Sequence, residues 1–368
     1  MKVALITYHQ VYNYGSSLQA YATQKLIERN GCNVEIINYV PERFRNYGSF
    51  LQTYREKSWF CKNPLKCLLI TFVCMPSRRK QKKIFSMFDH FLNLGNVIYK
   101  KDLVQLNGKY DAFFTGSDQV WNNHFGGFDT AFFLDFVGDS KCYAYSASFG
   151  KDNFDEKELH QLKKLLSKYC YVSVREKSGI SILKRIGFNG IQLLDPIYAL
   201  SKSEWLSIAE FPSTSKDYIL VYQLNSKNRL IEEAVKLKEV TNTRKIVIIE
   251  YERRKHDPRV EYVSLPTVNR FLGLFANAKY VVTDSFHGTS FSLKFNKEFF
   301  VALPPNFQGR IQNVLQLVEL ESRIIGQSRS VDQICLESID WDTVNCILEK
   351  EAQRNFKFMS KCISDIKR

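Results

Sequence analysis

The sequence predicts an α/β protein made of two doubly wound parallel sheets with a cleft between them. Apolar runs of strand length alternate with amphipathic helical patterns along most of the chain. The first elements follow the order strand, helix, strand, which implies parallel pairing through a right-handed crossover. A polar segment with a proline, Ser201–Lys216, separates this series from a second one that begins near Asp217. A chain of 368 residues is long enough for two domains.

The first domain is expected at residues 1–205. Val3–Tyr8 predicts a buried strand, and Ser16–Arg29 predicts a helix that ends at Gly31. A basic and mostly helical insertion at about 41–106 interrupts the alternation. The remaining predicted strands are Val34–Tyr39, Tyr110–Thr115, Cys142–Ala147, Tyr171–Arg175 and Ile191–Leu194, and the remaining helices are Asp155–Lys168 and Lys177–Ile186.

The second domain is expected at residues 215–340. Residues 341–368 should form a helical tail that packs back across the N-terminal domain. The predicted strands of this half are Tyr218–Leu224, Lys245–Tyr251, Tyr262–Leu265, Tyr280–Thr283 and Phe299–Leu303. The predicted helices are Asn228–Val240, Val268–Ala276, Thr289–Phe295 and Arg310–Leu317.

Composition indicates a cytoplasmic globular protein. The hydrophobic fraction is 45% and the charged fraction 24%, which is ordinary for a soluble domain. The start of the chain does not resemble a signal peptide, and no apolar run reaches the length of a transmembrane helix. The nine cysteines include no Cys-x-x-Cys pair, so neither a zinc site nor a disulfide framework is expected.

The formal net charge of +14 is unevenly distributed. Between Arg43 and Lys83 there are eleven Lys and Arg residues and one acid, Glu56, and the same stretch carries the apolar run Leu65–Met75. Basic charge beside an apolar helix suits peripheral contact with an anionic membrane surface. The alternative is a basic insertion whose apolar side packs on its own domain. No nucleic-acid-binding motif accompanies the charge, so a nucleic-acid partner is not expected.

The end of the strand Tyr280–Thr283 carries the most pronounced site pattern. Polar residues follow it directly and lead into a helix, so side chains and backbone N–H groups should meet at the carboxyl edge of the sheet, where open α/β sheets bind ligands. His287 could move a proton there, with Arg310 as a second cation. The alternative for His287 is a structural hydrogen bond. The polar residues in question are Asp284, Ser285, His287, Gly288 and Thr289.

Three earlier strand ends carry further candidates. The first loop includes Asn13, Tyr14 and Gly15, which could face a ligand or simply form a tight turn and helix cap. In the next loop, Asp118 could bind sugar hydroxyls or act as a base, and Trp121 could stack on a sugar ring. The alternatives are an Asx turn and a core tryptophan.

Arg175 stands where a predicted strand becomes a helix. Its planar guanidinium suits a carboxylate or a phosphate at the ligand edge of the sheet. The alternative is a structural ion pair with Glu176 or Asp195.

Taken together and in order, four segments resemble the polysaccharide pyruvyl transferase family. The short runs Tyr145–Gly150 and Leu194–Pro196 also fit, so the resemblance extends from residue 1 to about 325. The four segments are Asn13–Ala22, Gly116–Trp121, Ser173–Gly179 and Thr283–Thr289.

This resemblance implies two Rossmann-like domains similar to a GT-B glycosyltransferase. It also implies phosphoenolpyruvate as donor, a hexose of a surface glycan such as a capsule or exopolysaccharide as acceptor, and a cyclic pyruvate ketal as product. The family's histidine matches His287 and its arginine matches Arg175. Several family branches place an arginine two residues before the histidine, where this chain has Ser285. Donor binding would then depend on Arg175, on Arg310 or Lys294, or on helix N–H groups.

The mechanistic hypothesis assigns a role to each candidate. His287 protonates the methylene carbon, and Asp118 or Asp284 accepts the proton of a sugar hydroxyl. No metal and no redox cofactor is required. Donor contacts are expected from Arg175, Ser285, Gly288, Thr289 and Arg310, and acceptor contacts from Asn13, Tyr14, Gly15 and Trp121.

Two other functions stay open from the sequence. One is a nucleotide-sugar glycosyltransferase of the same fold, although no Glu-x7-Glu pair stands out near Asp284. The other is a non-catalytic glycan-binding protein. The basic segment suits an acceptor linked to polyprenyl diphosphate, with the protein held at the inner face of the cytoplasmic membrane.

Overall fold

A computed structural model describes residues 1–58, 63–123, 127–213, 216–225, 229–251, 256–305, 308–326, 330–334 and 337–368. The chain divides into two compact units. Unit 1 contains Met1–Val174, Ser181–Ile191 and Met359–Arg368, and unit 2 contains Arg175–Ile180 and Gln192–Phe358.

Unit 1 is built on a six-stranded sheet in the order β2-β1-β3-β4-β5-β6. Its central strands are completely buried, as their apolar sequences require for a sheet covered on both faces. The parallel register aligns Val3 with Val34 on one side and with Ala112 on the other. The strands are β1 (Lys2–Ile6), β2 (Asn33–Ile36), β3 (Ala112–Thr115), β4 (Lys141–Ala147), β5 (Tyr169–Val174) and β6 (Ile191–Gln192).

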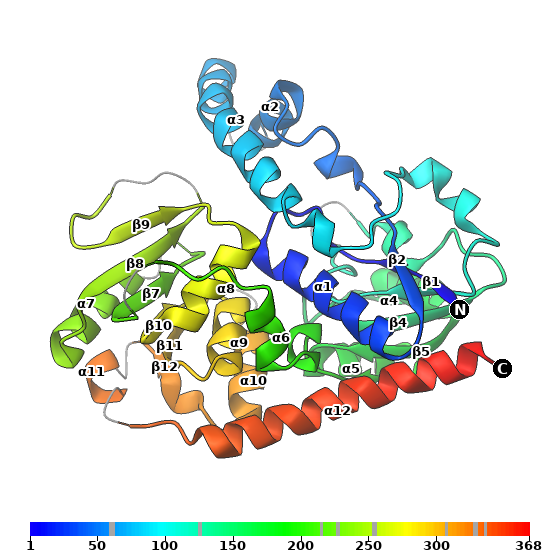
Figure 1. Ribbon diagram of the computed structural model, residues 1–368. Helices are drawn as coiled ribbons and strands as arrows, with labels where there is room; N and C mark the ends of the chain where they lie inside the picture. The colour runs from blue at the N-terminus through cyan, green and yellow to red at the C-terminus, as the bar shows by residue number, and fades with distance from the viewer. Residues whose placement is uncertain are drawn as a thin grey trace. The chain divides into compact units, whose positions relative to one another are not determined.

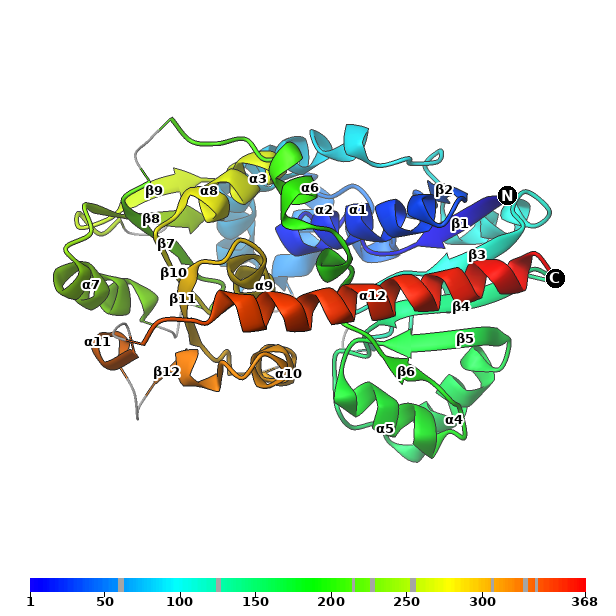
Figure 2. The same ribbon diagram turned by 60° about the horizontal axis from the view of Figure 1, so that its bottom comes forward.

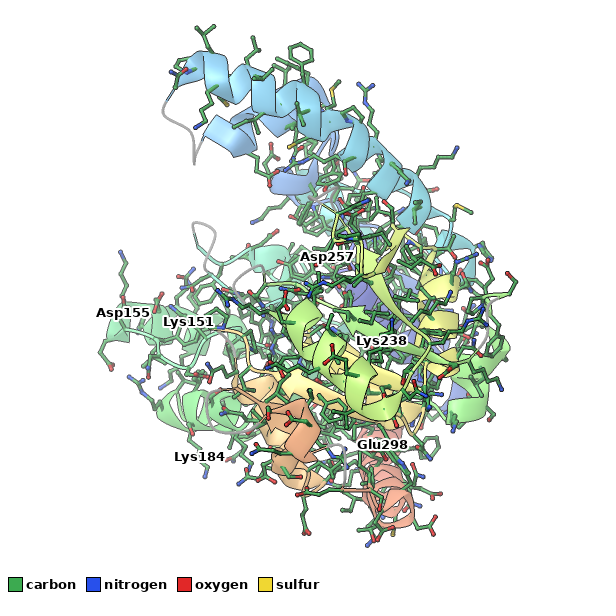
Figure 3. All side chains as sticks on the ribbon, turned by 90° about the vertical axis from the view of Figure 1, so that its left-hand side faces the viewer. Lys151, Asp155, Lys184, Lys238, Asp257 and Glu298 are labelled. Atoms are coloured by element: carbon green, nitrogen blue, oxygen red, sulfur yellow. The ribbon has the colours of Figure 1, made fainter. Side chains whose placement is uncertain are left out.

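Local sequence determines where the helices of unit 1 begin. In α1 (Tyr14–Arg29) the Asn13 side chain accepts a hydrogen bond from Gly15 N at the N-cap. In α4 (Glu156–Leu166) Asp155 and Glu158 form a capping box, and Lys151 pairs with Glu158 at 2.7 Å. Asp155 and Lys151 are labelled in Figure 3. The third helix, α5 (Lys177–Arg185), follows β5.

The insertion between β2 and β3 is helical over most of its described length. Its two α-helices, α2 (Phe50–Ser58) and α3 (Pro64–Ser86), pack against each other (Figure 1). Short 3-10 turns complete the segment at Glu42–Phe44, Asp89–Phe91 and Lys100–Leu106.

Unit 2 contains a second six-stranded parallel sheet in the order β12-β11-β10-β7-β8-β9. Its core includes Val221 on β7, Ile248 on β8, Val282 on β10 and Phe300 on β11. The strands are β7 (Tyr218–Tyr222), β8 (Lys245–Glu250), β9 (Glu261–Ser264), β10 (Tyr280–Thr283), β11 (Glu298–Ala302) and β12 (Ile324–Ile325). The strand β12 was not predicted, because two apolar residues carry no periodicity.

The helices of unit 2 follow the predicted order, with one shift that matters for the site. The helix α9 (Phe286–Lys294) begins three residues before the predicted Thr289, so His287 lies in its first turn. The other helices are α6 (Lys202–Ser207), α7 (Leu230–Thr241), α8 (Val268–Asn277), α10 (Gly309–Leu317), α11 (Val331–Ile334) and α12 (Trp341–Ile366). The predicted helix starting at Asn228 begins outside the described residues.

The division into units differs from the expected boundary at Ser201–Lys216. Unit 2 takes up the chain from Gln192 and includes Arg175–Ile180, whereas the end of the tail helix belongs to unit 1. There, Tyr143 Oη on β4 donates a hydrogen bond to the Asp365 carboxylate at 2.6 Å, and Lys361 Nζ lies 4.0 Å from the centre of the Tyr171 ring. Figure 2 shows the C-terminal end of α12 running beside β4 and β5. Within the described ranges, no helix combines the length and the apolar character needed to cross a membrane.

Candidate functional site

The carboxyl end of β10 leads directly into α9. Thr283 Oγ1 donates a hydrogen bond to the Tyr222 carbonyl on the neighbouring strand at 2.7 Å. The side chain of Ser285 then caps the helix by accepting a hydrogen bond from Gly288 N at 3.3 Å. This compact turn places His287 as the second residue of α9. Ser285 therefore serves as the helix cap. Its contact with a donor substrate stays a prediction.

Asp284 anchors the end of a neighbouring strand. Its two carboxylate oxygens accept hydrogen bonds from Leu224 N at 2.7 Å and Asn225 N at 2.9 Å, and the residue is 2% exposed. A buried carboxylate held by two backbone N–H groups is poorly placed to take a proton from a substrate. The structure thus gives Asp284 an anchoring role, and its expected action as a base stays a prediction.

Gly288 and Thr289 hold α9 against the sheet. A Cβ added to Gly288 would lie 2.3 Å from Thr283 Oγ1 and 3.1 Å from Tyr222 Cδ1, so only glycine fits there. The buried Thr289 hydroxyl donates to the Ser285 carbonyl at 3.0 Å. Both residues were predicted to contact the donor directly, but their side-chain positions are filled by packing.

Three ionisable side chains from separate segments of unit 2 meet beside the first turn of α9. Arg175 Nη1 lies 2.5 Å from Asp195 Oδ2, and His287 Nε2 lies 3.8 Å from the same oxygen. The other Asp195 oxygen accepts a hydrogen bond from Ile197 N at 3.1 Å. Asp195 thus connects a buried arginine to the histidine that the sequence pattern emphasised.

Asp195 remains ionised although it is fully buried. Burial by itself would raise the pKa of this carboxyl, but His287, Arg175 and the Ile197 N–H outweigh burial and lower the pKa to about 2. A fixed negative charge therefore faces Nε2 of His287 at all ordinary pH values.

The orientation of His287 leaves one ring nitrogen for chemistry. Nε2 is buried, has no hydrogen-bond partner among the described residues, and faces the Asp195 carboxylate. The side chain as a whole is 12% exposed, so contact with a ligand has to come through the other side of the ring, which carries Nδ1. The 3.8 Å separation from Asp195 is within the range of an ion pair but longer than a hydrogen bond.

Arg175 is a structural ion-pair residue in this structure. Its side chain is 2% exposed and pairs with both Asp195 and Glu176, the latter at 3.5 Å. Burial does not favour direct contact with a donor substrate, which stays a prediction. The arginine stabilises Asp195 instead, and its guanidinium carbon lies 5.2 Å from the centre of the Phe286 ring.

Arg310 brings a second cation to the start of α9. Its guanidinium carbon lies 5.7 Å from the centre of the Phe286 ring, and the residue is partly exposed. Phe286 is the first residue of the helix, where the partial positive charge of the helix adds to that of the arginine. The predicted grouping of Arg310 with His287 is consistent with this arrangement.

Asp118 occupies the corresponding sheet edge in unit 1. Its backbone is left-handed, with φ +75°, a strained conformation for a residue other than glycine. One carboxylate oxygen accepts a hydrogen bond from Ser16 Oγ at 2.5 Å, and the other accepts one from Gln119 N at 2.8 Å. The side chain is partly exposed, so it stays accessible to a ligand.

The other candidates of unit 1 are mainly structural. Trp121 is fully buried, stacks on Phe133 at 5.3 Å between ring centres and donates its indole N–H to the Phe132 carbonyl, so it cannot stack on a sugar. Tyr14 and Gly15 are buried in the first turn of α1, and Asn13 is its cap. The alternatives of a core tryptophan and a helix-capping loop describe these residues better than acceptor binding does.

Asp195 is the residue that sequence reasoning undervalued. It was weighed only as an ion-pair partner of Arg175. The signal for it was present, because an acidic residue followed by Pro196 directly after a predicted strand is a polar group at the ligand edge of the sheet. In the described part of the chain, no group of three or more His, Cys, Asp or Glu side chains could hold a metal ion.

The two six-stranded parallel sheets define an α/β protein of the GT-B-like fold class, with two Rossmann-like units. The chain belongs to the polysaccharide pyruvyl transferase family, whose sequence model matches residues 13–303. This membership makes the protein a polysaccharide-modification transferase. The match covers Asp118, Arg175, Asp195 and His287 but ends before Arg310.

Solved structures support the fold alone. The Anabaena protein HepE in complex with UDP-glucose matches with a TM-score of 0.51 and 9% identity, covering 99% of this chain and 98% of that one. MnaA of S. aureus in a structure with UDP matches with a TM-score of 0.50 and 11% identity, covering 99% of this chain and 94% of that one. No curated protein sequence matches the chain.

Proposed function

We propose that this protein transfers the enolpyruvyl group of phosphoenolpyruvate to two hydroxyls of one hexose in a surface polysaccharide or its precursor. The product is a cyclic pyruvate ketal, and inorganic phosphate is released. The observation that carries the proposal is the buried, ionised Asp195 carboxylate at 3.8 Å from His287 Nε2, within the region that matches the family.

In the proposed mechanism His287 is the acid. It gives a proton from Nδ1 to the methylene carbon, which becomes a methyl group, and the adjacent carbon becomes an oxocarbenium-like centre. The charge of Asp195 stabilises the protonated imidazole and fixes its orientation, much as a carboxylate orients the histidine of a catalytic triad. The first sugar hydroxyl adds to the electron-poor carbon.

Phosphate leaves in the second half of the reaction. The bond between the carbon and the phosphate oxygen breaks, and the second hydroxyl of the same hexose adds to close the ketal. Of the two hydroxyl protons, one restores His287, and the other is taken up by Asp118 and then leaves with the phosphate. We assign Asp118 the acceptance of a hydroxyl proton, a role supported by its strained backbone and partly exposed carboxylate.

The donor is doubly anionic, and the start of α9 suits an anion of this kind. Among the described residues, no hydrogen-bond partner is found for the backbone N–H groups of Phe286 and His287. Arg310 adds a full positive charge beside them. We propose that Arg310 takes the role of the arginine that some family branches carry at the position of Ser285.

Replacement of His287 tests the acid role. His287→Ala should abolish the release of inorganic phosphate from phosphoenolpyruvate plus acceptor, and the melting temperature should stay close to that of the wild type. His160→Ala, on the exposed face of α4, removes a histidine elsewhere and should leave the rate unchanged. Turnover of the His287→Ala variant at the wild-type rate would contradict the proposal.

A nucleotide-sugar glycosyltransferase is the second candidate, because HepE carries UDP-glucose on the same fold. Thermal shift separates the two functions without knowledge of the acceptor. Stabilisation by phosphoenolpyruvate and not by UDP supports pyruvyl transfer, whereas stabilisation by UDP alone supports glycosyl transfer. A response to neither ligand favours a non-catalytic glycan-binding protein.

A further inference from the structure

A helix that packs on its own domain buries its apolar side. The helix α3 instead turns an apolar side to solvent. Its buried residues are Cys67, Thr71, Arg78 and Phe85. Its large apolar residues face solvent instead, with exposed fractions of 78% for Leu65, 66% for Leu69, 55% for Phe72 and 71% for Val73. Clustered exposed leucine, phenylalanine and valine side chains mark a surface that another apolar phase covers.

The inward face of α3 is already satisfied by polar contacts with α2. Arg78 Nη1 lies 2.6 Å from the Glu56 carboxylate and donates to Gln52 Oε1 at 3.2 Å. Cys67 Sγ donates to the Tyr54 carbonyl at 3.6 Å. These bonds fix the rotation of α3 about its axis, so the exposed apolar residues cannot turn inward without breaking the contacts of the buried Arg78 side chain.

The lower half of α3 is fastened to unit 1. Gln81 Nε2 donates to the Tyr12 carbonyl at 3.0 Å, and Phe85 packs on Tyr14 with 4.9 Å between the ring centres. The exposed apolar residues lie in the N-terminal half of the helix, before Pro76. The sequence left two alternatives open, and burial of the apolar side on its own domain is not what the described residues show.

The same face of α3 becomes cationic towards its C-terminal end. Arg79 follows Phe72 by seven residues, and Lys83 follows Arg79 by four. These intervals place all three residues on one side of the helix. Arg79, Lys82 and Lys83 line a hollow of about 610 Å³ in unit 1. The remaining lining residues are Asn46, Tyr47, Gly48, Ser49 and Ser86, so the described lining contains no carboxylate.

We propose that the outward face of α3 docks on an anionic phospholipid bilayer. Leu65, Leu69, Phe72 and Val73 enter the boundary of the acyl chains, and Arg79, Lys82 and Lys83 contact the lipid phosphates. From Leu65 to Val73 the helix extends about 12 Å, enough to lie in the interface but not to cross the membrane. A nucleic acid would use the cations but leave the leucines exposed, so the combination favours lipid.

Cosedimentation with vesicles tests this docking. Wild-type protein should sediment with vesicles of phosphatidylglycerol and phosphatidylcholine and stay in solution with phosphatidylcholine alone. Lys82→Gln/Lys83→Gln should lower the partition coefficient about thirtyfold, because each basic residue near an anionic surface strengthens binding about fivefold. Lys163→Gln/Lys164→Gln, on the exposed side of α4, removes the same charge and should bind like the wild type.

A second variant pair tests insertion of the apolar face. Leu69→Trp should be quenched by lipids brominated on their acyl chains, and Val240→Trp, at an exposed site on α7, should not be. Leu69→Glu/Val73→Glu should abolish cosedimentation while the melting temperature stays unchanged, because both side chains face solvent.

Three results would overturn the proposal. The first is equal sedimentation of the wild type with neutral and with anionic vesicles. The second is an equal loss of binding in the Lys82/Lys83 and Lys163/Lys164 variants, and the third is no quenching of Leu69→Trp. Binding of DNA in place of vesicles would point to a nucleic-acid surface and count against it as well. Because no phosphoenolpyruvate or acceptor is present, the outcome is independent of the proposed reaction.

Discussion

His287 Nε2 lies 3.8 Å from Oδ2 of Asp195, an oxygen that also receives Arg175 Nη1 at 2.5 Å. The three residues come from the first turn of α9, the segment after β6 and the end of β5. The positive charge of Arg175 offsets the cost of burying the Asp195 carboxylate, and this carboxylate orients the ring of His287. Each of the three roles leads to a measurable consequence.

Asp195→Asn keeps the shape of the side chain and removes its charge. The variant should lose about 100-fold or more in kcat, because the protonated imidazole loses its carboxylate. The free energy of unfolding should fall by about 3 kcal/mol, since Arg175 is left as a buried charge without its strongest partner. Phosphate release and urea denaturation measure the two effects. Glu156→Gln breaks an exposed pair with Arg185 and should change neither.

The stability lost in Asp195→Asn should depend on pH. The pKa of Asp195 is about 2 in the folded protein, below its ordinary value of 3.8. A lowered pKa stabilises the fold above pH 3.8, and this contribution disappears as the pH falls towards 2. The difference in unfolding free energy between wild type and variant should therefore shrink by about 1 kcal/mol at pH 3 and by about 2 kcal/mol at pH 2. A difference that stays constant from pH 7 to pH 3 would show that the carboxyl is not held ionised.

Arg310→Ala should weaken the donor site. We expect kcat/KM for phosphoenolpyruvate to fall about 10- to 150-fold, the range for loss of a charged hydrogen bond. Most of the change should appear in KM, and Arg310→Lys should recover part of it. Initial rates at varied phosphoenolpyruvate measure this, with Arg185→Ala as the control for an exposed arginine. An unchanged KM would exclude Arg310 from the donor site.

Gly288→Ala should disturb α9 through packing alone. The new methyl group would meet Thr283 Oγ1 at 2.3 Å, and overpacking of this kind costs about 1–3 kcal/mol. Because the contact lies one residue after His287, activity should fall together with stability. At Gly309 no atom lies within 4 Å of an added Cβ, so Gly309→Ala is the matched control. Thermal unfolding that leaves the two variants alike would refute the packing argument.

Asp118→Asn tests the proposed base in unit 1. Asparagine tolerates the left-handed backbone and can still accept the Ser16 hydrogen bond, so the fold should persist. Ketal formation should slow about 100-fold, as expected for loss of a general base. The exposed Asp152→Asn serves as the control. Normal rates in Asp118→Asn would limit this residue to a structural turn.

Much of the fold could be predicted because periodicity is a local property of the chain. The strands β1, β3, β4, β7 and β10 appear where apolar runs occur, and the helices between them follow the 3.6-residue pattern. The starting residues of helices were less certain. Ser285 caps α9 through a side-chain bond, and this choice over a later start depends on the geometry of the turn.

The candidate site was predicted in part. The sequence alone pointed to His287, Arg310 and Asp118, because a polar residue after a strand must lie at the edge of the sheet. It could not separate a ligand-facing Trp121 from a buried one, or a catalytic Asp284 from an anchoring one. Those distinctions depend on which neighbouring backbone groups and rings surround each side chain.

The sequence by itself determined the order of strands and helices, the family to which the chain belongs and the residues at each strand end. Tertiary structure decided which of these residues meet. Asp195 and His287 are far apart in the chain, and only the packing of α9 beside the segment after β6 brings a fixed charge to the imidazole. Tertiary structure also decided that α3 turns its leucines outward, because helical periodicity shows that two faces differ but not which one the protein covers.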